Sequence, residues 1–356
     1  MIEYSLALLG FGNVARALAR LLLRKRAELA ANYGLTFKIT AIATSKHGMA
    51  IDYTGIDIAE ALKISKRSEN GEWNLERLSR EPAPRDARDF IQRCGAQVLF
   101  ENTPVNYPSG QPAVDHLRLA LENKMHAITA NKGPIVHAFR ELTELAEKQG
   151  RKFYFESAVM DGAPIFSLFR EALPGAQLRA FRGVLNSTTN LILTRMEGGE
   201  SFSEALAHAQ KIGIAETDPS GDIDGWDAAV KVAALVTVLM GIPLKPQQVA
   251  RQGIRGITSD DIDDARRKGR RWKLVCSAVR SGDGAEAWVA PQMVPPTSPL
   301  YQVEGTTSIV QFETDVLGQL SLIEENPGPE TTAYGLLADF LNAVKADRIA
   351  GQGRRS

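Results

Sequence analysis

The chain has 356 residues, of which 44% are hydrophobic and 24% are charged, as in an ordinary globular protein long enough for two domains. Its 42 basic and 42 acidic residues give zero net charge and form no basic cluster, which argues against nucleic acid as a partner. The longest apolar run, 233–242, is too short to span a membrane, and the N-terminus lacks the pattern of a signal peptide. Two cysteines, Cys94 and Cys276, make neither a disulfide framework nor a zinc site, so we expect a cytoplasmic protein.

The first predicted elements are a buried parallel strand at 6–9 and a helix from Val14 to about Ala30. Between them the chain has the pattern G-x-G-x-x-A, in which the first glycine permits a tight turn and the second lets the backbone approach a pyrophosphate. The helix N-terminus then faces the phosphates. The alternative is a glycine turn that binds no ligand. We predict a dinucleotide site at Gly10, Phe11, Gly12, Asn13, Val14 and Ala15.

The second strand, predicted at 37–43, ends where a dinucleotide-binding domain often has an acid that holds the ribose 2′-hydroxyl. This chain has Thr44, Ser45 and Lys46 there, followed by His47. Hydroxyls and a cation suit a 2′-phosphate, so the sequence favours NADP over NAD. A solvated turn that happens to contain a lysine is the alternative.

Further strands and helices alternate along the next segment: a strand at 97–101, a helix at 113–123 and a strand at 126–129. Lys132 follows the last of these strands, and doubly wound sheets bind ligands at the carboxyl ends of their strands. We therefore expect Lys132 to contact the cofactor or to act in catalysis, although a lysine there can be a simple surface charge. The polar segment 64–93 has no clear periodicity and is expected to form an inserted helix and surface loops.

The segment 216–231 reads E-T-D-P-S-G-D-I-D-G-W-D-A-A-V-K and contains five carboxylates ahead of an apolar helix predicted at 226–240. Asp227 and Lys231 are the charges of that helix, and their i, i+4 spacing puts both on one face. A structural ion pair at a helix start would explain them. The acids do not follow the alternation of an EF-hand calcium loop. A carboxylate cluster beside a partly desolvated lysine would also suit a small zwitterion.

Eight motifs spread along the chain resemble those of homoserine dehydrogenase in its short form, without an aspartate kinase or a regulatory domain. They occur in the order found in that family, and 213–231 is the most specific segment. The motifs are G-F-G-N-V-A at 10–15, T-A-N-K-G-P at 129–134, G-A-P-I at 162–165, N-S-T-T-N-L-I-L at 186–193, A-Q-K-I-G-I-A-E-T-D-P at 209–219, D-I-D-G-W-D-A-A-V-K at 222–231, S-P-L-Y-Q-V-E-G at 298–305 and P-G-P-E-T-T-A at 327–333.

The resemblance implies an NAD(P)-dependent oxidoreductase that interconverts L-homoserine and L-aspartate 4-semialdehyde in threonine, methionine and isoleucine biosynthesis. It implies that Glu216 and Asp227 bind the substrate with support from Asp222, and that Lys231 transfers the proton. Lys132 would lie between nicotinamide and substrate. The further residues that it implies are Thr103 and Gly328 near the cofactor, and backbone oxygens of Glu156, Val159, Asp161 and Ala163 around a sodium or potassium ion.

The chain departs from the family at Met160-Asp161, where a small residue usually precedes a glycine, and at Ser187, where the family usually has a glycine between Asn and Thr. We expect the Asp161 carboxylate to point at the cation rather than into the substrate cleft, and Ser187 to tighten the pocket. A dehydrogenase of the same scaffold with a different hydroxy amino acid or semialdehyde as substrate is one alternative. A non-catalytic NADP-binding sensor is another. A thiol-based aldehyde dehydrogenase is disfavoured by the positions of the two cysteines.

These observations predict an α/β protein with a Rossmann-type doubly wound parallel sheet and a second α+β domain. The dinucleotide domain is expected at 1–155 with a C-terminal return at about 328–350, which includes a helix near 332–346. The substrate domain is expected at 156–285. Extended segments at 286–327 would complete a sheet that, by the resemblance, builds a homodimer. A frayed tail is expected at 351–356.

Overall fold

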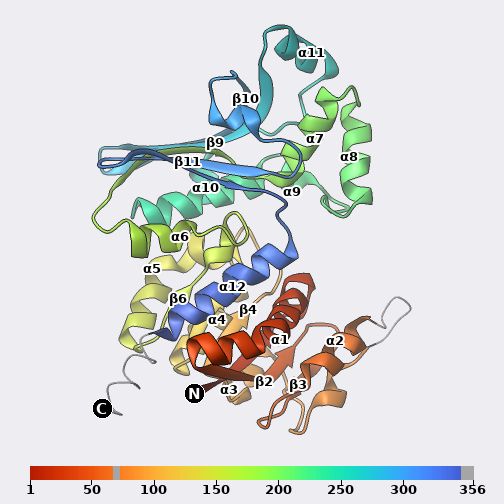
Figure 1. Cartoon of the computed structure of the whole chain (residues 1–356), viewed down its shortest axis with the longest axis vertical. Coiled ribbons are helices and arrows are strands. Elements are labelled where there is room, and N and C mark those ends of the chain that lie inside the picture. Colours follow the sequence, from red (N-terminus) through yellow and green to blue (C-terminus); the bar gives the residue numbers. More distant parts are fainter. Residues whose placement is uncertain (67–72, 346–356) are drawn as a thin grey trace. The chain divides into compact units, whose positions relative to one another are not determined.

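The computed structural model describes residues 1–66 and 73–345. The chain divides into two compact units (Figure 1). Unit 1 comprises Met1–Pro164 and the segment that begins at Gly328, and unit 2 comprises Ile165–Pro327. The tail predicted at 351–356 and the end of the helix predicted to reach Ala346 lie outside the described residues.

Unit 1 contains a six-stranded sheet in the order β3-β2-β1-β4-β5-β6. Neighbouring strands are parallel except for the short β3, which pairs antiparallel with β2. This is the predicted doubly wound sheet. The order reverses between β1 and β4, so the ligand crevice of such a sheet falls beside their carboxyl ends. The strands are β1 (Ile2–Leu9), β2 (Leu35–Ala43), β3 (Met49–Ile51), β4 (Val98–Glu101), β5 (His126–Thr129) and β6 (Phe153–Tyr154).

The C-terminal helix belongs to unit 1, where Figure 1 shows it beside the first helix of the chain. The Phe340 ring meets the Tyr4 ring at 5.8 Å and the Phe100 ring at 6.2 Å between centroids, both edge to face. Such contacts add to the burial of apolar area and fix the helix on the sheet. The helices are α1 (Asn13–Tyr33), α2 (Ile58–Lys66), α3 (Ala87–Arg93), α4 (Ala113–Glu122), α5 (Lys132–Lys148) and α12 (Pro329–Ala343).

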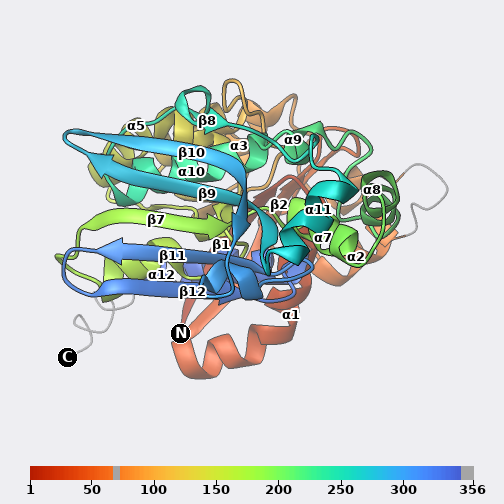
Figure 2. The ribbon, with the colours of Figure 1, turned by 90° about the horizontal axis from the view of Figure 1, so that it is seen from above.

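Unit 2 contains a second six-stranded sheet, whose long strands lie side by side in Figure 2. Its order is β12-β11-β7-β9-β10-β8, and the pairs are antiparallel except for β8 with β10. The strands are β7 (Leu178–Val184), β8 (Ala250–Arg251), β9 (Arg271–Ser281), β10 (Gly284–Val294), β11 (Ser308–Thr314) and β12 (Gly318–Glu324).

The apolar helix of unit 2, α10 (Trp226–Leu239), begins after Gly225, whose φ of +79° is favourable for glycine. It packs against β9 and β10 and is buried along most of its length, which explains why its sequence is apolar on every face. None of the helices in the described ranges is both long and apolar enough to cross a membrane. The other helices of unit 2 are α6 (Ile165–Ser167), α7 (Ser187–Glu197), α8 (Phe202–Lys211), α9 (Ser220–Ile223) and α11 (Ser259–Arg267).

Candidate active site

The turn between β1 and α1 has the geometry that the glycine pattern predicts. Gly10 has a φ of +93°, and a Cβ atom there would lie 2.5 Å from the carbonyl oxygen of Asn102, so the position requires glycine. A Cβ on Gly12 would meet no atom within 4 Å, which leaves space for a phosphate at the N-terminus of α1. Phe11 is buried and can approach a cofactor only through its backbone. The buried Ala15 packs the helix onto the sheet.

Asn102, directly after β4, carries an unsatisfied side chain beside this turn. Both its amide nitrogen and its amide oxygen are buried without a hydrogen-bond partner in the described part of the chain. Buried polar groups are normally paired, because an unpaired one costs roughly 1–3 kcal/mol. An amide offers both a donor and an acceptor, as the ribose and carboxamide groups of a nicotinamide nucleotide require. The open Gly12 turn and the unpaired Asn102 amide therefore fit a dinucleotide.

A buried carboxylate connects the loops after β4 and β5. Glu101 is fully buried and accepts hydrogen bonds from the backbone nitrogen of Thr103 at 3.1 Å, from the Thr103 hydroxyl, and from the Thr129 hydroxyl at 2.9 Å. Asn131 donates to the Thr103 carbonyl at 3.2 Å and caps α5, so that Lys132 is the first residue of that helix. The network fixes Thr103 and Lys132 at the carboxyl edge of one sheet.

The turn after β2 presents the residues expected to select the cofactor. The Thr44 hydroxyl accepts a hydrogen bond from the backbone nitrogen of His47 at 2.8 Å, and the His47 ring stacks on Trp73 with centroids 4.1 Å apart. Ser45 and Lys46 are exposed between these anchors. The side chains available to a 2′-phosphate are thus a hydroxyl and an ammonium at the end of β2.

The loop expected to bind a monovalent cation is fixed against α12. Met160 and Asp161 have φ values of +53° and +43°, which side-chain-bearing residues rarely adopt. The Asp161 carboxylate accepts a hydrogen bond from the Thr331 hydroxyl at 3.2 Å. Gly328 caps α12 with extended backbone, and a Cβ there would meet no atom within 4 Å.

In unit 2 the predicted acids and lysine form a compact cluster around Asn186. The Asn186 amide donates to Asp222 at 2.7 Å and to Asp227 at 3.0 Å. The Lys231 ammonium lies 2.9 Å from the Asp227 carboxylate and donates to the Leu185 carbonyl at 2.5 Å. The side chains of Lys231 and Asp227 are only 14% and 9% exposed, so the pair is largely shielded from water.

Three of the five acids in the loop are placed elsewhere. Asp224 forms a two-point ion pair with Arg255 at 2.9 and 3.0 Å, and Asp218 accepts from the backbone nitrogen of Ser220. The Glu216 side chain is exposed and makes no contact with the cluster in this structure. Of the predicted substrate acids, the structure therefore brings Asp222 and Asp227 together.

The sequence did not single out Asn186 as a site residue, although it starts a predicted motif. Its oxygen caps α7 by accepting from the backbone nitrogen of Thr189 at 2.8 Å, which leaves its amide nitrogen for the two acids. Asn is a preferred residue at helix N-caps, so its place before a predicted helical segment could have indicated this role. Ser187 is the first residue of α7 and has no positive φ, so its replacement of a glycine causes no backbone strain.

Burial, and next the neighbouring charge of Asp227, raise the pKa of Asp222 above its ordinary value of 3.8. A raised carboxyl pKa in the folded state means that the folded protein binds the proton more tightly, so stability falls as pH rises above 3.8. We expect Asp222→Asn to unfold at higher urea concentration than wild type at pH 7, with a difference that shrinks as the pH approaches 4. The exposed Asp218→Asn should show no gain. If Asp222→Asn unfolded at a lower urea concentration than wild type, by an amount that did not change with pH, the raised pKa of Asp222 would be contradicted.

Both cysteines are free and buried. Burial raises the pKa of the Cys94 thiol to about 11 and that of the Cys276 thiol to about 12. A catalytic cysteine needs an accessible thiolate, so these two thiols do not supply the nucleophile of a thiol-based aldehyde dehydrogenase.

Two family profiles match the chain. The profile described as the homoserine dehydrogenase NAD-binding domain covers residues 10–156, and the one described as homoserine dehydrogenase covers 164–341. The NAD(+)-dependent homoserine dehydrogenase of Pseudomonas canavaninivorans is 36% identical over 343 residues, 96% of each chain.

Solved structures agree with the profiles. A putative homoserine dehydrogenase from Archaeoglobus fulgidus superposes with a TM-score of 0.83 at 30% identity, covering 96% of this chain and 99% of the other. A hyperthermophilic archaeal homoserine dehydrogenase mutant in complex with NADPH has a TM-score of 0.78 at 28% identity, covering 97% and 98%. These proteins share both units with this chain.

Proposed function

Since the chain belongs to the homoserine dehydrogenase family, we propose that it interconverts L-homoserine and L-aspartate 4-semialdehyde with a nicotinamide cofactor. This reaction serves the biosynthesis of threonine, methionine and isoleucine in the family. The observation that carries the proposal is the shielded cluster of Asp222, Asp227, Lys231 and Asn186. A sensor that only bound the cofactor would have no use for it.

The charges of the cluster suit the ammonium of an amino acid. Asp222 and Asp227 carry two negative charges when ionised, and Lys231 balances one of them, so a single positive charge from the substrate completes the site. Asn186 holds the two carboxylates side by side, which raises the electrostatic attraction for that ammonium. We propose Glu216 as a further substrate ligand from the exposed part of the same loop.

Oxidation of the alcohol removes one proton from the hydroxyl and a hydride from the same carbon, and a bound nicotinamide would supply the hydride acceptor. Lys231 is assigned the proton transfer, because its Nζ atom is held by the Leu185 carbonyl and by Asp227 in a shielded site. Its neutral amine form accepts the proton in the oxidation, and the resulting ammonium returns it in the reduction. Lys132 is assigned the positioning of the substrate hydroxyl beside the nicotinamide, supported by its place at the start of α5. Thr103, whose hydroxyl is fixed by Glu101, would support the same ring.

Substrate discrimination tests this function directly. We expect the protein to reduce NADP with L-homoserine as substrate. The kcat/KM should be at least about tenfold lower with L-serine, which is one methylene shorter. The same measurement with 3-aminopropan-1-ol, which lacks the carboxylate, separates recognition of the ammonium from recognition of the whole amino acid. Turnover of a different hydroxy amino acid or semialdehyde, with none of homoserine, would establish the alternative dehydrogenase.

We propose NADP as the preferred cofactor, with NAD as the alternative. The relatives are divided, since one is described as NAD(+)-dependent and another was solved with NADPH. The exposed Ser45 and Lys46 after β2 and the absence of an acid at 44–47 support NADP. Lys46→Ala is expected to raise the KM for NADP several-fold while leaving that for NAD unchanged, because one charge-assisted contact with a phosphate is lost. An unchanged KM for NADP, or a wild-type preference for NAD, would contradict the assignment.

A monovalent cation is proposed at the backbone oxygens of Glu156, Val159, Asp161 and Ala163. The left-handed backbone at Asp161 and the fixation of this loop by Thr331 support a preformed turn. Activity across sodium and potassium concentrations tests it, and identical activity in the absence of both ions would reject the site.

We further propose a homodimer formed through the open face of the unit 2 sheet. Trp288, the exposed Val279 and the exposed Ile323 lie on one face of that sheet, as the strand register requires. Sedimentation velocity of wild type and of Val279→Glu tests this interface. A wild-type protein that sediments as a monomer would exclude the dimer.

The two free cysteines support a cytoplasmic location.

A further inference from the structure

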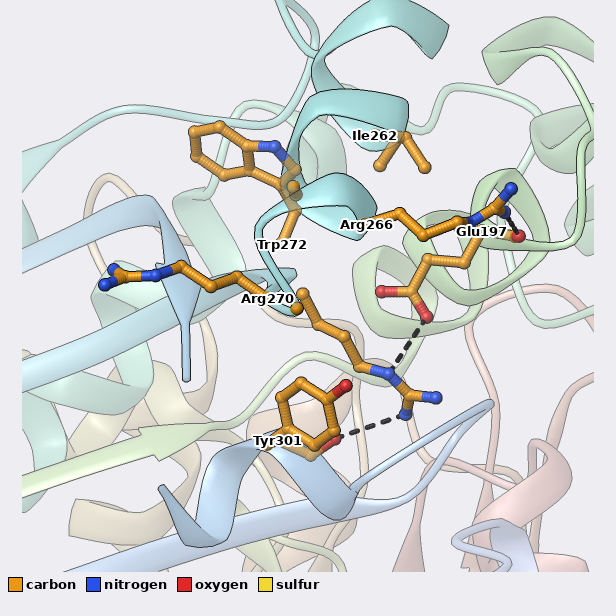
Figure 3. Close-up of a pocket in the computed structure, with 9 residues that line it drawn as sticks. Glu197, Ile262, Arg266, Arg270, Trp272 and Tyr301 are labelled. Carbon is orange, nitrogen blue, oxygen red and sulfur yellow. Dashed lines mark hydrogen bonds and ion pairs between the residues drawn. The ribbon is translucent and has the colours of Figure 1, made fainter. Parts of the chain in front are cut away.

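Unit 2 contains a cavity of about 190 Å³ remote from the acid cluster (Figure 3). Glu197, the last residue of α7, lies on one side, and the other lining residues come from α11, the turn that follows it, the start of β9 and Tyr301. Asn186 caps the other end of α7, so the 11 residues of the helix separate the two sites by about 16 Å. The residues that matter are Glu197, Ile262, Arg266, Arg271, Trp272 and Tyr301.

Glu197 has an unsatisfied oxygen in this cavity. Its Oε2 atom lies 3.6 Å from the Arg271 guanidinium, whereas Oε1 is buried and has no hydrogen-bond partner among the residues that the structure describes. Figure 3 shows one Glu197 oxygen joined by a dashed line to a nitrogen below it, and the other oxygen directed away from that contact. Burial raises the pKa of Glu197, as expected for a carboxylate that lacks a full set of donors. The cavity therefore presents an acceptor that needs a donor from outside the chain.

Two guanidinium groups contact Glu197 at its other oxygen atoms. Arg266 donates to the backbone oxygen of Glu197 and forms an exposed 3.6 Å ion pair with Asp263. Arg271 donates to the Tyr301 carbonyl at 3.2 Å and pairs with Glu304. A guanidinium has five N–H donors, so each arginine retains donors for another acceptor.

This combination discriminates between classes of ligand. A simple anion would meet the Glu197 carboxylate, and a simple cation would meet the three arginines that line the cavity, Arg266, Arg270 and Arg271, so each would suffer repulsion in a partly desolvated site. A molecule with a positive and a negative end satisfies both. We propose that this cavity binds a small amino acid with an apolar side chain, its ammonium on Glu197, its carboxylate on Arg266 and Arg271, and its side chain against Ile262 and Trp272.

Calorimetric titration of the full chain, without cofactor or homoserine, tests the proposal independently of any enzyme activity. The probes are L-valine, isobutylamine and 3-methylbutanoate, which are valine, valine without its carboxylate and valine without its ammonium. We expect valine to bind one molecule per chain and each truncated probe to bind at least about tenfold more weakly, because a charged hydrogen bond contributes that much.

Matched variants locate the binding. Glu197→Gln and Arg266→Gln are expected to weaken valine binding by about tenfold or more. Arg267→Gln is the control, since Arg267 is 70% exposed and pairs with Asp264 at 3.5 Å. Thermal unfolding of each variant verifies its folding. No binding of valine to wild type would overturn the proposal, as would equal binding of 3-methylbutanoate. Binding that survives both substitutions but is lost in Asp222→Asn would place valine in the acid cluster instead and also overturn it.

Discussion

Lys231→Ala is expected to lower kcat for homoserine oxidation by about 10²- to 10⁴-fold, the usual effect of removing a positioned proton-transfer group. The reason is geometric, because Lys231 is fixed by the Leu185 carbonyl at 2.5 Å and by Asp227 at 2.9 Å in a site with little exposure to water. The measurement is steady-state kinetics at saturating homoserine and NADP. Fluorescence titration with NADPH should give an unchanged affinity, since the glycine turn belongs to unit 1.

Lys211→Ala is the matched control, because Lys211 is an exposed lysine of the same unit, at the end of α8. It should retain wild-type kcat. A Lys231→Ala enzyme with lower stability but normal turnover would show that the Asp227–Lys231 pair is a structural ion pair. That result would remove the proton-transfer role and leave the family membership intact.

Gly10→Ala is expected to destabilise unit 1 by about 2–5 kcal/mol, because it combines an unfavourable φ of +93° with a Cβ atom 2.5 Å from the Asn102 oxygen. Urea unfolding measures this. Gly12→Ala provides the comparison, since Gly12 has a φ of −79° and open space around it. Its stability should stay within roughly 0.5 kcal/mol of wild type, while its affinity for NADPH falls by about tenfold, or 1.4 kcal/mol.

Equal stability of the two glycine variants would contradict the described turn. Unchanged NADPH affinity in Gly12→Ala would contradict the approach of a pyrophosphate to that residue, because the added methyl group occupies the space left for it.

Elements with a strong local pattern could be predicted from the sequence. The G-x-G-x-x-A turn specifies its own conformation, since Gly10 is the residue that tolerates the positive φ and the nearby Asn102 carbonyl. The i, i+4 spacing of Asp227 and Lys231 likewise placed both charges on one face of α10, where they form an ion pair.

Contacts between distant segments could not be predicted in this way. Asn186 meets residues 36 and 41 positions away, and Asp161 meets Thr331 at a separation of 170. Nothing in the local sequence of Asp161 indicates that a hydroxyl of the C-terminal helix will pair with its carboxylate. The Asn102 amide and the Glu197 Oε1 atom are buried without a hydrogen-bond partner among the described residues. Tertiary packing creates both features, because a polar side chain is buried only when distant segments cover it.

Isotope transfer tests whether the protein passes a hydride from homoserine directly to the nicotinamide ring. Homoserine with both hydrogens of its alcohol carbon replaced by deuterium is incubated with the protein and NADP, and both products are analysed by mass spectrometry. Direct hydride transfer predicts one deuterium in the reduced cofactor and the other in the aldehyde group of aspartate semialdehyde. Reduced cofactor without deuterium, or labelled homoserine left unconsumed, would contradict it.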